Sequence, residues 1–371
     1  MAPRNPSQCL CFTVAVALFM SLTVGVSTPA PILTIKSPDG DVIQCVSRDE
    51  QPSLRHPSLQ NHKLQETPTD MVQKEEEYGW QVWHSAGYRC PEGTIPIRKF
   101  DGILPSATSD RDIREHQYAI AYVDSHPHIY GTKATISVWD PIVHSPADFS
   151  LAQVWLVAGQ YKTNDLNTIE AGWQRDAYVD TGCYSLHCAG FVQVSRSIAL
   201  EAAISPTSIV GGDRVNITIK IWKDRVSGNW WLGMGANVAV VPIGYWPEKI
   251  FTTLSDHATM VQWGGEVFYN ISSNMSYVPQ MGSGERAKKG NASYFCDLEI
   301  AEVKGTFLPV QTFQVKEDYP YAVKKSSSTA CGNYFYYGGP GLGPLRSAAV
   351  CSSQPKVIVV VFFILFFRLF L

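Results

Sequence analysis

Short runs of alternating apolar and polar residues, separated by glycine-containing turns, recur from Tyr118 to Tyr269. The clearest is Val215–Ile221, where Val and Ile alternate with polar residues, as a strand with one buried face requires. No helical period of useful length accompanies these runs. We therefore expect an all-β fold, an antiparallel β-sandwich or barrel of about 240 residues. The expected strands are 118–123, 135–140, 152–157, 215–221, 238–243 and 259–269.

Residues 1–27 have the features of a secretory signal peptide. Arg4 supplies the positive end, Cys9–Val26 is the apolar run, and Ser27 is a small residue near a cleavage point. A membrane anchor is the alternative, but Thr13 and Thr23 interrupt the run. The sequence thus predicts a secreted protein, extracellular or in a cell wall.

Secretion agrees with the glycosylation sequons and the cysteines. The sequons lie at Asn216, Asn270, Asn274 and Asn291. Seven cysteines follow the signal, and an oxidising compartment would pair most of them. The expected local pairs are Cys45–Cys90, Cys183–Cys188 and Cys331–Cys351, although sequence alone proves no pairing. Because seven is odd, one cysteine is left over, and Cys296 has no obvious partner in the pattern.

The region before the sandwich reads as a separate segment, residues 28–114. A strand, a Pro-Asp-Gly turn and a second strand are expected over 34–45, and order returns at 90–98. Between them, 47–78 is polar and charged and cannot bury a core of its own. Exposed basic residues at 98–99 and 111–114 are places where a protease could cut. The sandwich is therefore placed at 115–351.

The chain ends in a hydrophobic tail, residues 352–371. Its apolar run, Val357–Leu371, is short for a spanning helix, which needs about 20 residues. A lipid-anchor signal is one interpretation, with small residues near Ser347 followed by a spacer and a hydrophobic end. The other is a short membrane-seeking or dispensable extension. The tail therefore predicts possible membrane or GPI anchoring without deciding it.

Two glutamates stand in segments that otherwise read as strands. Glu170 lies between Ile169 and Ala171, and Glu266 between Gly265 and Val267, where strand propensity and burial disfavour a carboxylate. Alternation puts Glu170 on one face with Gln174, and Glu266 on one face with Gln262, each with a glycine between. Glycine admits another backbone, and glutamine can donate or accept a hydrogen bond. The alternative is that one or both glutamates simply face solvent.

Two neighbouring carboxyl groups do not both ionise readily, so one pKa rises and the pair shares a proton. Such a pair can hydrolyse an amide in acid, or it can cleave a glycoside. Other chemistries lack a motif: no His-Glu-x-x-His, no Gly-x-Ser-x-Gly, and a Gly-rich 338–343 that precedes no helix. We expect no metal and no cofactor. The net charge of −3 predicts no nucleic-acid partner.

These segments resemble the neprosin family of plant glutamic endopeptidases. The resemblance is carried by Asn167–Gln174, Gly244–Pro247, Trp263–Val267 and Tyr334–Gly341, and in the N-terminal part by Ile35–Asp41, His56–Pro57, Asn61–Lys63 and Cys90–Pro96. It implies a zymogen whose propeptide, the peptidase's own inhibitor, is removed in acid, followed by an antiparallel β-sandwich. The family's catalytic glutamates fall on Glu170 and Glu266, and the characterised activity is cleavage after proline. Gln174 and Gln262 are added as candidates for holding the water or the substrate carbonyl.

Two other functions stay open on the residues alone. A secreted β-sandwich that binds cell-wall polymer or peptide without turnover would suit the 12% aromatic content. A glycoside hydrolase would need a carboxyl separation that sequence does not give. A further hypothesis concerns latency: the prosegment covers the carboxyl pair at neutral pH through its charges and loosens as carboxylates protonate.

Overall fold

The computed structural model describes residues 30–69, 80–99, 114–126, 128–143, 148–176, 185–187, 189–235, 240–270, 278–342 and 356–365. Within these residues the strands form three antiparallel sheets, of three, nine and six strands. The prediction of an antiparallel all-β fold preceded by a small N-terminal unit is confirmed.

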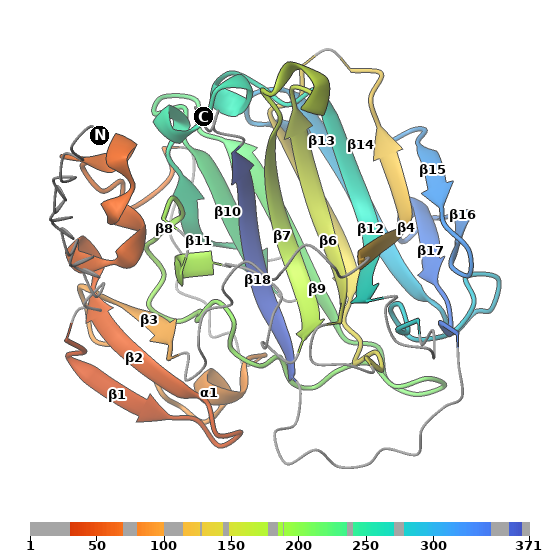
Figure 1. Cartoon of the computed structure of the whole chain (residues 1–371), viewed down its shortest axis with the longest axis horizontal. Helices are drawn as coiled ribbons and strands as arrows, with labels where there is room; N and C mark the ends of the chain where they lie inside the picture. The colour runs from red at the N-terminus through yellow and green to blue at the C-terminus, as the bar shows by residue number, and fades with distance from the viewer. Residues whose placement is uncertain are drawn as a thin grey trace, which may run out of the picture.

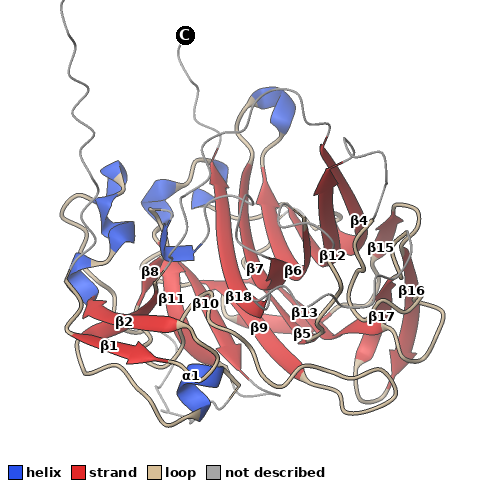
Figure 2. Cartoon of the chain, turned by 60° about the horizontal axis from the view of Figure 1, so that its bottom comes forward, coloured by secondary structure: helices blue, strands red, loops and turns tan. Residues whose placement is uncertain are grey.

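The larger two sheets lie face to face (Figures 1 and 2). The six-stranded sheet has the order β15-β4-β12-β6-β7-β18, and the nine-stranded sheet has the order β16-β17-β13-β5-β9-β10-β11-β8 with β14 on β13. The six strands are β4 (Arg114–Val123), β6 (Phe149–Ala158), β7 (Asn167–Asp176), β12 (Met260–Asn270), β15 (Gln314–Glu317) and β18 (Lys356–Leu365). The nine are β5 (Gly131–Ser137), β8 (Val192–Gln193), β9 (Asn216–Lys223), β10 (Trp230–Gly235), β11 (Val241–Trp246), β13 (Ser293–Val303), β14 (Thr306–Pro309), β16 (Ala322–Ser328) and β17 (Gly332–Gly338).

The small sheet at the N-terminus has the order β1-β2-β3. Its strands are β1 (Leu33–Lys36), β2 (Val42–Ser47) and β3 (Thr94–Arg98). The helices are short, as the sequence predicts. They are α1 (Val82–Ser85) and the 3-10 turns η1 (Arg48–Glu50), η2 (Pro52–Arg55), η3 (Pro57–Leu59), η4 (Tyr161–Thr163), η5 (Ser185–His187), η6 (Glu248–Ile250) and η7 (Thr253–Ser255). In the described part of the chain, none of them has the length and apolar character that a bilayer span needs.

One core fills the space between the two large sheets, where alternate residues of both meet. From the six-stranded sheet it takes Ile169, Ala171 and Trp173 of β7 and Val154 and Leu156 of β6. Two indoles cross the interior to β5: Trp173 Nε1 donates to the carbonyl oxygen of Ser137 at 3.0 Å, and Trp263 Nε1 donates to Thr132 Oγ1 at 3.1 Å. These bonds fix which residues of β7 and β12 point outward.

The N-terminal unit is a stapled module that packs on the sandwich. The predicted Cys45–Cys90 disulfide is present, with the Cα atoms 5.5 Å apart. It lies in a small core with Trp83 of α1, and this core also takes in Ala199 and Ala202 of the sandwich. The module and the sandwich therefore share buried apolar surface.

Two buried glutamines of the module bind the sandwich through its backbone. Gln51 donates to the carbonyl oxygen of Gln193 at 3.1 Å and accepts from the amide of Gln193 at 2.8 Å. Gln81 makes the same two-way contact with Ala199, at 2.6 and 2.9 Å. Each side-chain amide thus pairs with a stretch of backbone as a neighbouring strand would.

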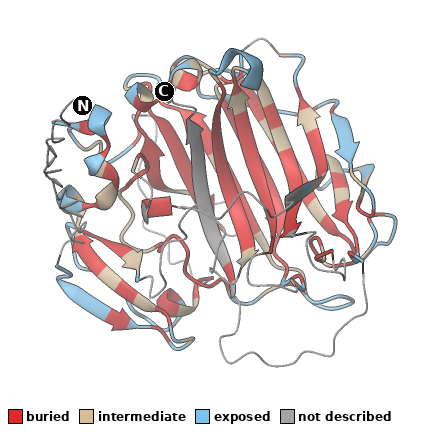
Figure 3. Cartoon of the chain, viewed as in Figure 1, coloured by how far each residue is buried: buried red, intermediate tan, exposed pale blue. Residues whose placement is uncertain are grey.

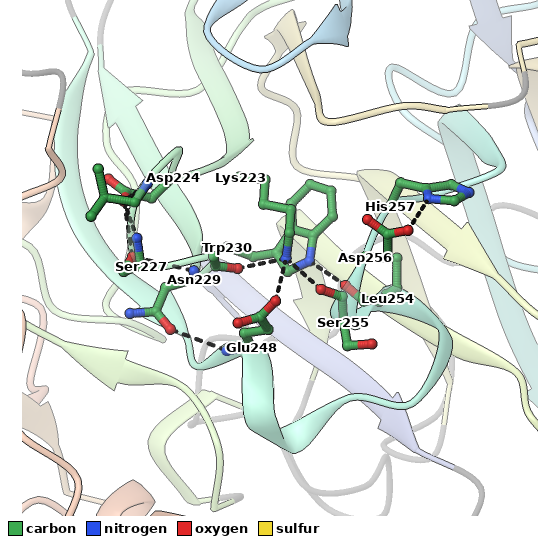
Figure 4. Close-up of polar contacts among 12 residues, drawn as sticks. Lys223, Asp224, Ser227, Asn229, Trp230, Glu248, Leu254, Ser255, Asp256 and His257 are labelled. Atoms are coloured by element: carbon green, nitrogen blue, oxygen red, sulfur yellow. Dashed lines mark hydrogen bonds and ion pairs between the residues drawn. The ribbon is translucent and has the colours of Figure 1, made fainter.

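Another group of docking contacts is made by Asp224 and Asn229, which lie close to the buried Lys223 (Figure 4). Lys223 Nζ donates to the carbonyl oxygens of Gly228 at 2.6 Å and Ser255 at 2.8 Å, and burial lowers its pKa to about 8. The adjacent Asp224 accepts from both the amide and the hydroxyl of Thr69, and Asn229 donates to Gln65. These contacts lie on the nine-stranded sheet, whereas the latency hypothesis placed the prosegment over the glutamates of the other sheet.

The disulfide predicted between Cys331 and Cys351 is wrong. Cys331 is bonded to Cys296, with the Cα atoms 5.1 Å apart. Pairing of β13 with β17, including Phe295 opposite Phe335, brings the two cysteines together from segments distant in sequence. Cys351, Cys183 and Cys188 lie outside the described residues.

The apolar tail contributes a strand. Residues Lys356–Leu365 form β18, which pairs with the whole of β7, from Lys356 opposite Asp176 to Leu365 opposite Asn167. Val357 is buried in the main core. Membrane association of the tail stays a prediction.

Two of the predicted sequons sit on described, surface-accessible side chains. Asn291 is exposed, and Asn216 is half-buried and accepts a hydrogen bond from the Tyr294 hydroxyl at 2.7 Å. Asn270 ends β12, and Asn274 lies outside the described residues.

Candidate active site

Glu170 and Glu266 lie on one face of the six-stranded sheet, the face turned away from the core between the sheets. β7 and β12 flank β6, and Glu170 is opposite Trp155 of β6 while Glu266 is opposite Leu151. Both glutamates are buried, with exposed fractions of 8% and 7%. Burial extends over most of β6, β7 and β12 (Figure 3). The alternative that the glutamates simply face solvent is therefore wrong.

The register sets the distance between the two glutamates. They lie two strands apart and are offset by the four-residue step from Leu151 to Trp155. A strand spacing of about 4.8 Å and a rise of about 3.3 Å per residue then separate their Cα atoms by about 16 Å. Two side chains reaching toward each other across that diagonal would leave room for a water and a peptide carbonyl. This spacing favours carboxyl groups that interact across a gap over two that share one proton directly.

Neutral hydrogen-bond donors surround the carboxyl group of Glu170. Thr168 Oγ1 donates to Oε1 at 2.8 Å, Gln153 Nε2 donates to Oε2 at 2.8 Å, and the indole N–H of Trp155 is a third donor. Burial, and then the negative charge of Glu266, raise the pKa of Glu170 from 4.5 to about 7, against the lowering effect of these donors. Glu170 therefore holds a proton throughout the acid range.

Glu266 has a different set of neighbours. His116 Nδ1 of β4 lies 2.5 Å from Glu266 Oε1, and the His116 side chain is about half exposed. The Tyr118 hydroxyl also hydrogen-bonds Glu266, and burial, then the charge of Glu266, raise the pKa of Tyr118. His116 and Tyr118, both from β4, thus give Glu266 two hydrogen-bonding partners.

Aromatic rings gather around Glu266. The His116 ring lies 4.7 Å from that of Phe268, and the Phe149 and Phe268 rings stack at 5.3 Å between centroids. Phe149, Phe268 and Trp155 belong to a separate apolar cluster on this outer face, with Tyr118 packed against it. We call Tyr118, Phe149 and Phe268 the ring cluster.

The glutamines predicted from the sequence lie on the same face but at different places. Gln174 is fully buried opposite Leu151, and Gln262 is opposite Trp155, with its Nε2 2.9 Å from Met260 Sδ. Their roles with substrate stay predictions. The glutamine that contacts Glu170 is Gln153, which the sequence analysis did not select, and neither did it select His116. A glutamine inside the apolar run 152–157 was the available signal for Gln153.

Comparison with known proteins gives two family matches and several similar structures. The family model described as neprosin matches residues 146–340, and the model described as neprosin activation peptide matches residues 34–103. One similar structure is a scytalido-glutamic peptidase with a peptide-based transition-state analog, at 11% identity and a TM-score of 0.33, covering 61% of this chain and 99% of that chain. Another is SCP-B, a member of the eqolisin family of peptidases in complex with the tripeptide Ala-Ile-His, with the same identity, coverage and TM-score.

The neprosin match spans more than half of the chain and contains both glutamates. The activation-peptide match contains β2, β3 and all of β1 except its first residue, Leu33. The chain belongs to the neprosin family.

Proposed function

We propose that this peptidase is an acid-acting glutamic endopeptidase in which Glu170 and Glu266 activate a water molecule against a peptide bond. The observation that carries the proposal is the contrast between two buried carboxyl groups on one sheet face. Burial favours a proton on Glu170, while a histidine lies 2.5 Å from Glu266. One group is thus suited to act as an acid and the other as a base.

The chemistry follows from these two states. The Glu266 carboxylate takes one proton from water, and the water oxygen bonds to the carbon of the scissile carbonyl. Glu170 gives its proton to the carbonyl oxygen as that oxygen gains negative charge. Collapse of the tetrahedral intermediate breaks the C–N bond, and the proton held by Glu266 passes to the departing amine. One hydroxyl group of the intermediate gives its proton to Glu170 as its oxygen becomes the carbonyl oxygen of the product acid, so both carboxyl groups recover their starting states.

Cleavage after proline would need an apolar surface next to the scissile bond. The ring cluster provides one, since Phe149 and Phe268 belong to the buried apolar group beside Glu266. A pyrrolidine ring has no N–H donor to leave unpaired, and it packs well against aromatic faces. We therefore assign the proline ring to the ring cluster.

The docked activation peptide offers a route to acid activation. His62 Nε2 lies 2.8 Å from the Tyr245 hydroxyl, and burial, then the charge of Lys249, lower the pKa of His62. Docking therefore favours neutral His62, and its stability falls as the pH drops below about 6.5. Asp224 acts in the same direction: although burial opposes the effect, hydrogen bonds from Ser227 and Thr69 lower its pKa. Ionised Asp224 therefore stabilises the docked activation peptide, and this stabilisation is lost when Asp224 is protonated in stronger acid.

The test of the dyad is hydrolysis of a proline-containing peptide by the acid-treated protein at about pH 4, where Glu170 should be protonated. Products are identified by mass spectrometry for wild type, Glu170→Gln and Glu266→Gln. Each variant should lose at least about 1,000-fold in kcat/KM. Glu302→Gln, the same chemical change at an exposed position of β13, is the control and should retain activity.

A folded, processed wild type without cleavage would overturn this proposal and favour a secreted sandwich that binds peptide or cell-wall polymer without turnover. Cleavage at bonds that lack proline would reject only the assignment of the ring cluster.

The test of acid release uses His62→Gln, which can still hydrogen-bond the Tyr245 hydroxyl but cannot become charged. Processing, followed on gels across the acid range, should begin at a lower pH than in wild type. Lys63→Gln changes the neighbouring charge and should leave the onset where it is. An unchanged onset in His62→Gln would remove His62 from the account of acid activation.

A further inference from the structure

A fully buried glutamine lies between the two catalytic carboxyl groups. Gln153 of β6 is opposite Gly172 of β7 on one side and Gly264 of β12 on the other. Its neighbours on the same face of β6, Leu151 and Trp155, are the residues opposite Glu266 and Glu170. Gln153 is therefore midway along the diagonal from one glutamate to the other.

The glycines opposite Gln153 are required by the close approach of the neighbouring strands. A Cβ atom on Gly172 would come within 2.5 Å of Gln153 Cβ, and one on Gly264 within 2.7 Å of Ile120 Cα. At this position in the sheet, β6 carries the long polar side chain of Gln153, while the neighbouring strands β7 and β12 carry glycines. Gly172 and Gly264 are the glycines that lie two residues from Glu170 and Glu266 in the sequence.

The two ends of the Gln153 amide have different surroundings. Nε2 donates to Glu170 Oε2 at 2.8 Å. Oε1 is buried and accepts no hydrogen bond from any residue that the structure describes. Buried amide oxygens in folded proteins nearly always have a donor. Gln153 Oε1 is therefore suited to accept a hydrogen bond from a water molecule or a substrate that enters the site.

We propose that Gln153 is a third catalytic residue, which holds Glu170 through its amide nitrogen and the attacking water through its amide oxygen. One O–H of the water donates to Gln153 Oε1, and the other gives its proton to Glu266. The uncharged Gln153 amide thus orients the water in the gap between the two carboxyl groups. This inference rests on the proposed function of Glu170 and Glu266.

A neutral amide suits this place because it donates and accepts at once, at any pH. A carboxylate there could accept but not donate, and it would place a second negative charge beside Glu170. A protonated carboxyl group, however, offers one donor and one acceptor like the amide. The chemistry of the position therefore predicts that glutamate can replace Gln153 only in acid.

The test compares Gln153→Met and Gln153→Glu with wild type on the proline-containing peptide from about pH 3 to pH 7, the range in which carboxyl groups change charge. Gln153→Met keeps the length and loses both hydrogen bonds, so kcat should fall about 100-fold at every pH while KM changes little. Gln153→Glu should stay within about tenfold of wild type at the acid end and approach the Met variant as the pH rises. The control is Ser150→Ala, which removes a buried hydroxyl from the core-facing side of the same strand and should leave kcat unchanged.

Three outcomes would overturn the inference. The first is a Gln153→Met variant that keeps more than about a third of the wild-type kcat, because so small a loss does not fit a catalytic hydrogen bond. The second is a Gln153→Glu variant that follows the wild-type pH profile, which would fit a purely structural role. The pH profile of Gln153→Glu decides the question by itself if the Met variant does not fold. The third is a folded, processed wild type that does not cleave the peptide, which would reject the roles of Glu170 and Glu266 and that of Gln153 with them. An active wild type together with an unaffected Met variant would reject the role of Gln153 alone.

Discussion

The same residue type, on the same face of one sheet, meets two unlike environments at Glu170 and at Glu266. Glu170 is enclosed by neutral donors from Thr168, Gln153 and Trp155, all on β6 and β7. Glu266 meets a half-exposed histidine and a tyrosine, both from β4. The closed side favours an uncharged carboxylic acid at Glu170, whereas Glu266 lies beside an imidazole and a hydroxyl that can hydrogen-bond a carboxylate.

This difference assigns roles that the residues alone leave undecided. An acid and a base can be made from two identical side chains when their surroundings separate their proton affinities. Here the surroundings differ because different strands supply the neighbours of the two glutamates. The neighbours of Glu170 come from β6 and β7, whereas β4 supplies an imidazole and a tyrosine hydroxyl to Glu266. The difference between the two environments can be tested by replacing one of the glutamates or by replacing a residue that hydrogen-bonds it.

The largest expected effect is on stability, and it concerns Glu170. A carboxyl group whose pKa rises from 4.5 to about 7 binds more protons in the folded than in the unfolded protein. Folding stability therefore falls as the pH rises between those values, by up to about 3 kcal/mol. Glu170→Gln removes the ionisation, so the variant should gain that much over wild type at pH 8 and little at pH 4.

The measurement is urea-induced unfolding of wild type, Glu170→Gln and Glu266→Gln at the two pH values. Glu266→Gln should show a smaller gain at pH 8, because it removes the negative charge that helps to raise the pKa of Glu170 but leaves the Glu170 carboxyl group buried. Equal pH dependence in wild type and Glu170→Gln would mean that Glu170 is not the buried acid, and the contrast between the two sites would be lost.

Strand alternation was enough to predict part of this site. Placing Glu170 and Gln174 on one face, with a glycine between them, needed only the two-residue period of a strand. The structure confirms this placement: Glu170 is opposite Trp155 and Gln174 is opposite Leu151, so both lie on the same face of β7. The side-chain direction along a strand is a local property, so sequence carries it.

Strand alternation could not predict the hydrogen-bond partners that other strands supply to the two glutamates. His116 reaches Glu266 only because β4 pairs with β12, 150 residues away, and Gln153 reaches Glu170 through the β6–β7 register. Cys296 was left unpaired for the same reason, since its partner depends on β13 lying beside β17. Sequence shows which way a strand's side chains point, but not which strand lies beside it.

The smaller expected effect concerns the partner of Glu266. His116→Gln keeps a polar group near Glu266 Oε1 but removes the imidazole ring, so the carboxyl group loses the short contact with His116 Nδ1. We expect kcat/KM in acid to fall about tenfold, which corresponds to about 1.4 kcal/mol. His128→Gln, at a histidine that packs against His257 instead, is the matched control and should leave the rate unchanged.

The kinetic constants of His116→Gln separate two roles for this histidine. If His116 acts through its hydrogen bond to Glu266, the variant should lose kcat while KM changes little. A loss confined to KM would instead show that His116 acts by shape, through its contact with Phe268. In that case only the closed side, around Glu170, would be an environment that the fold has tuned for the reaction.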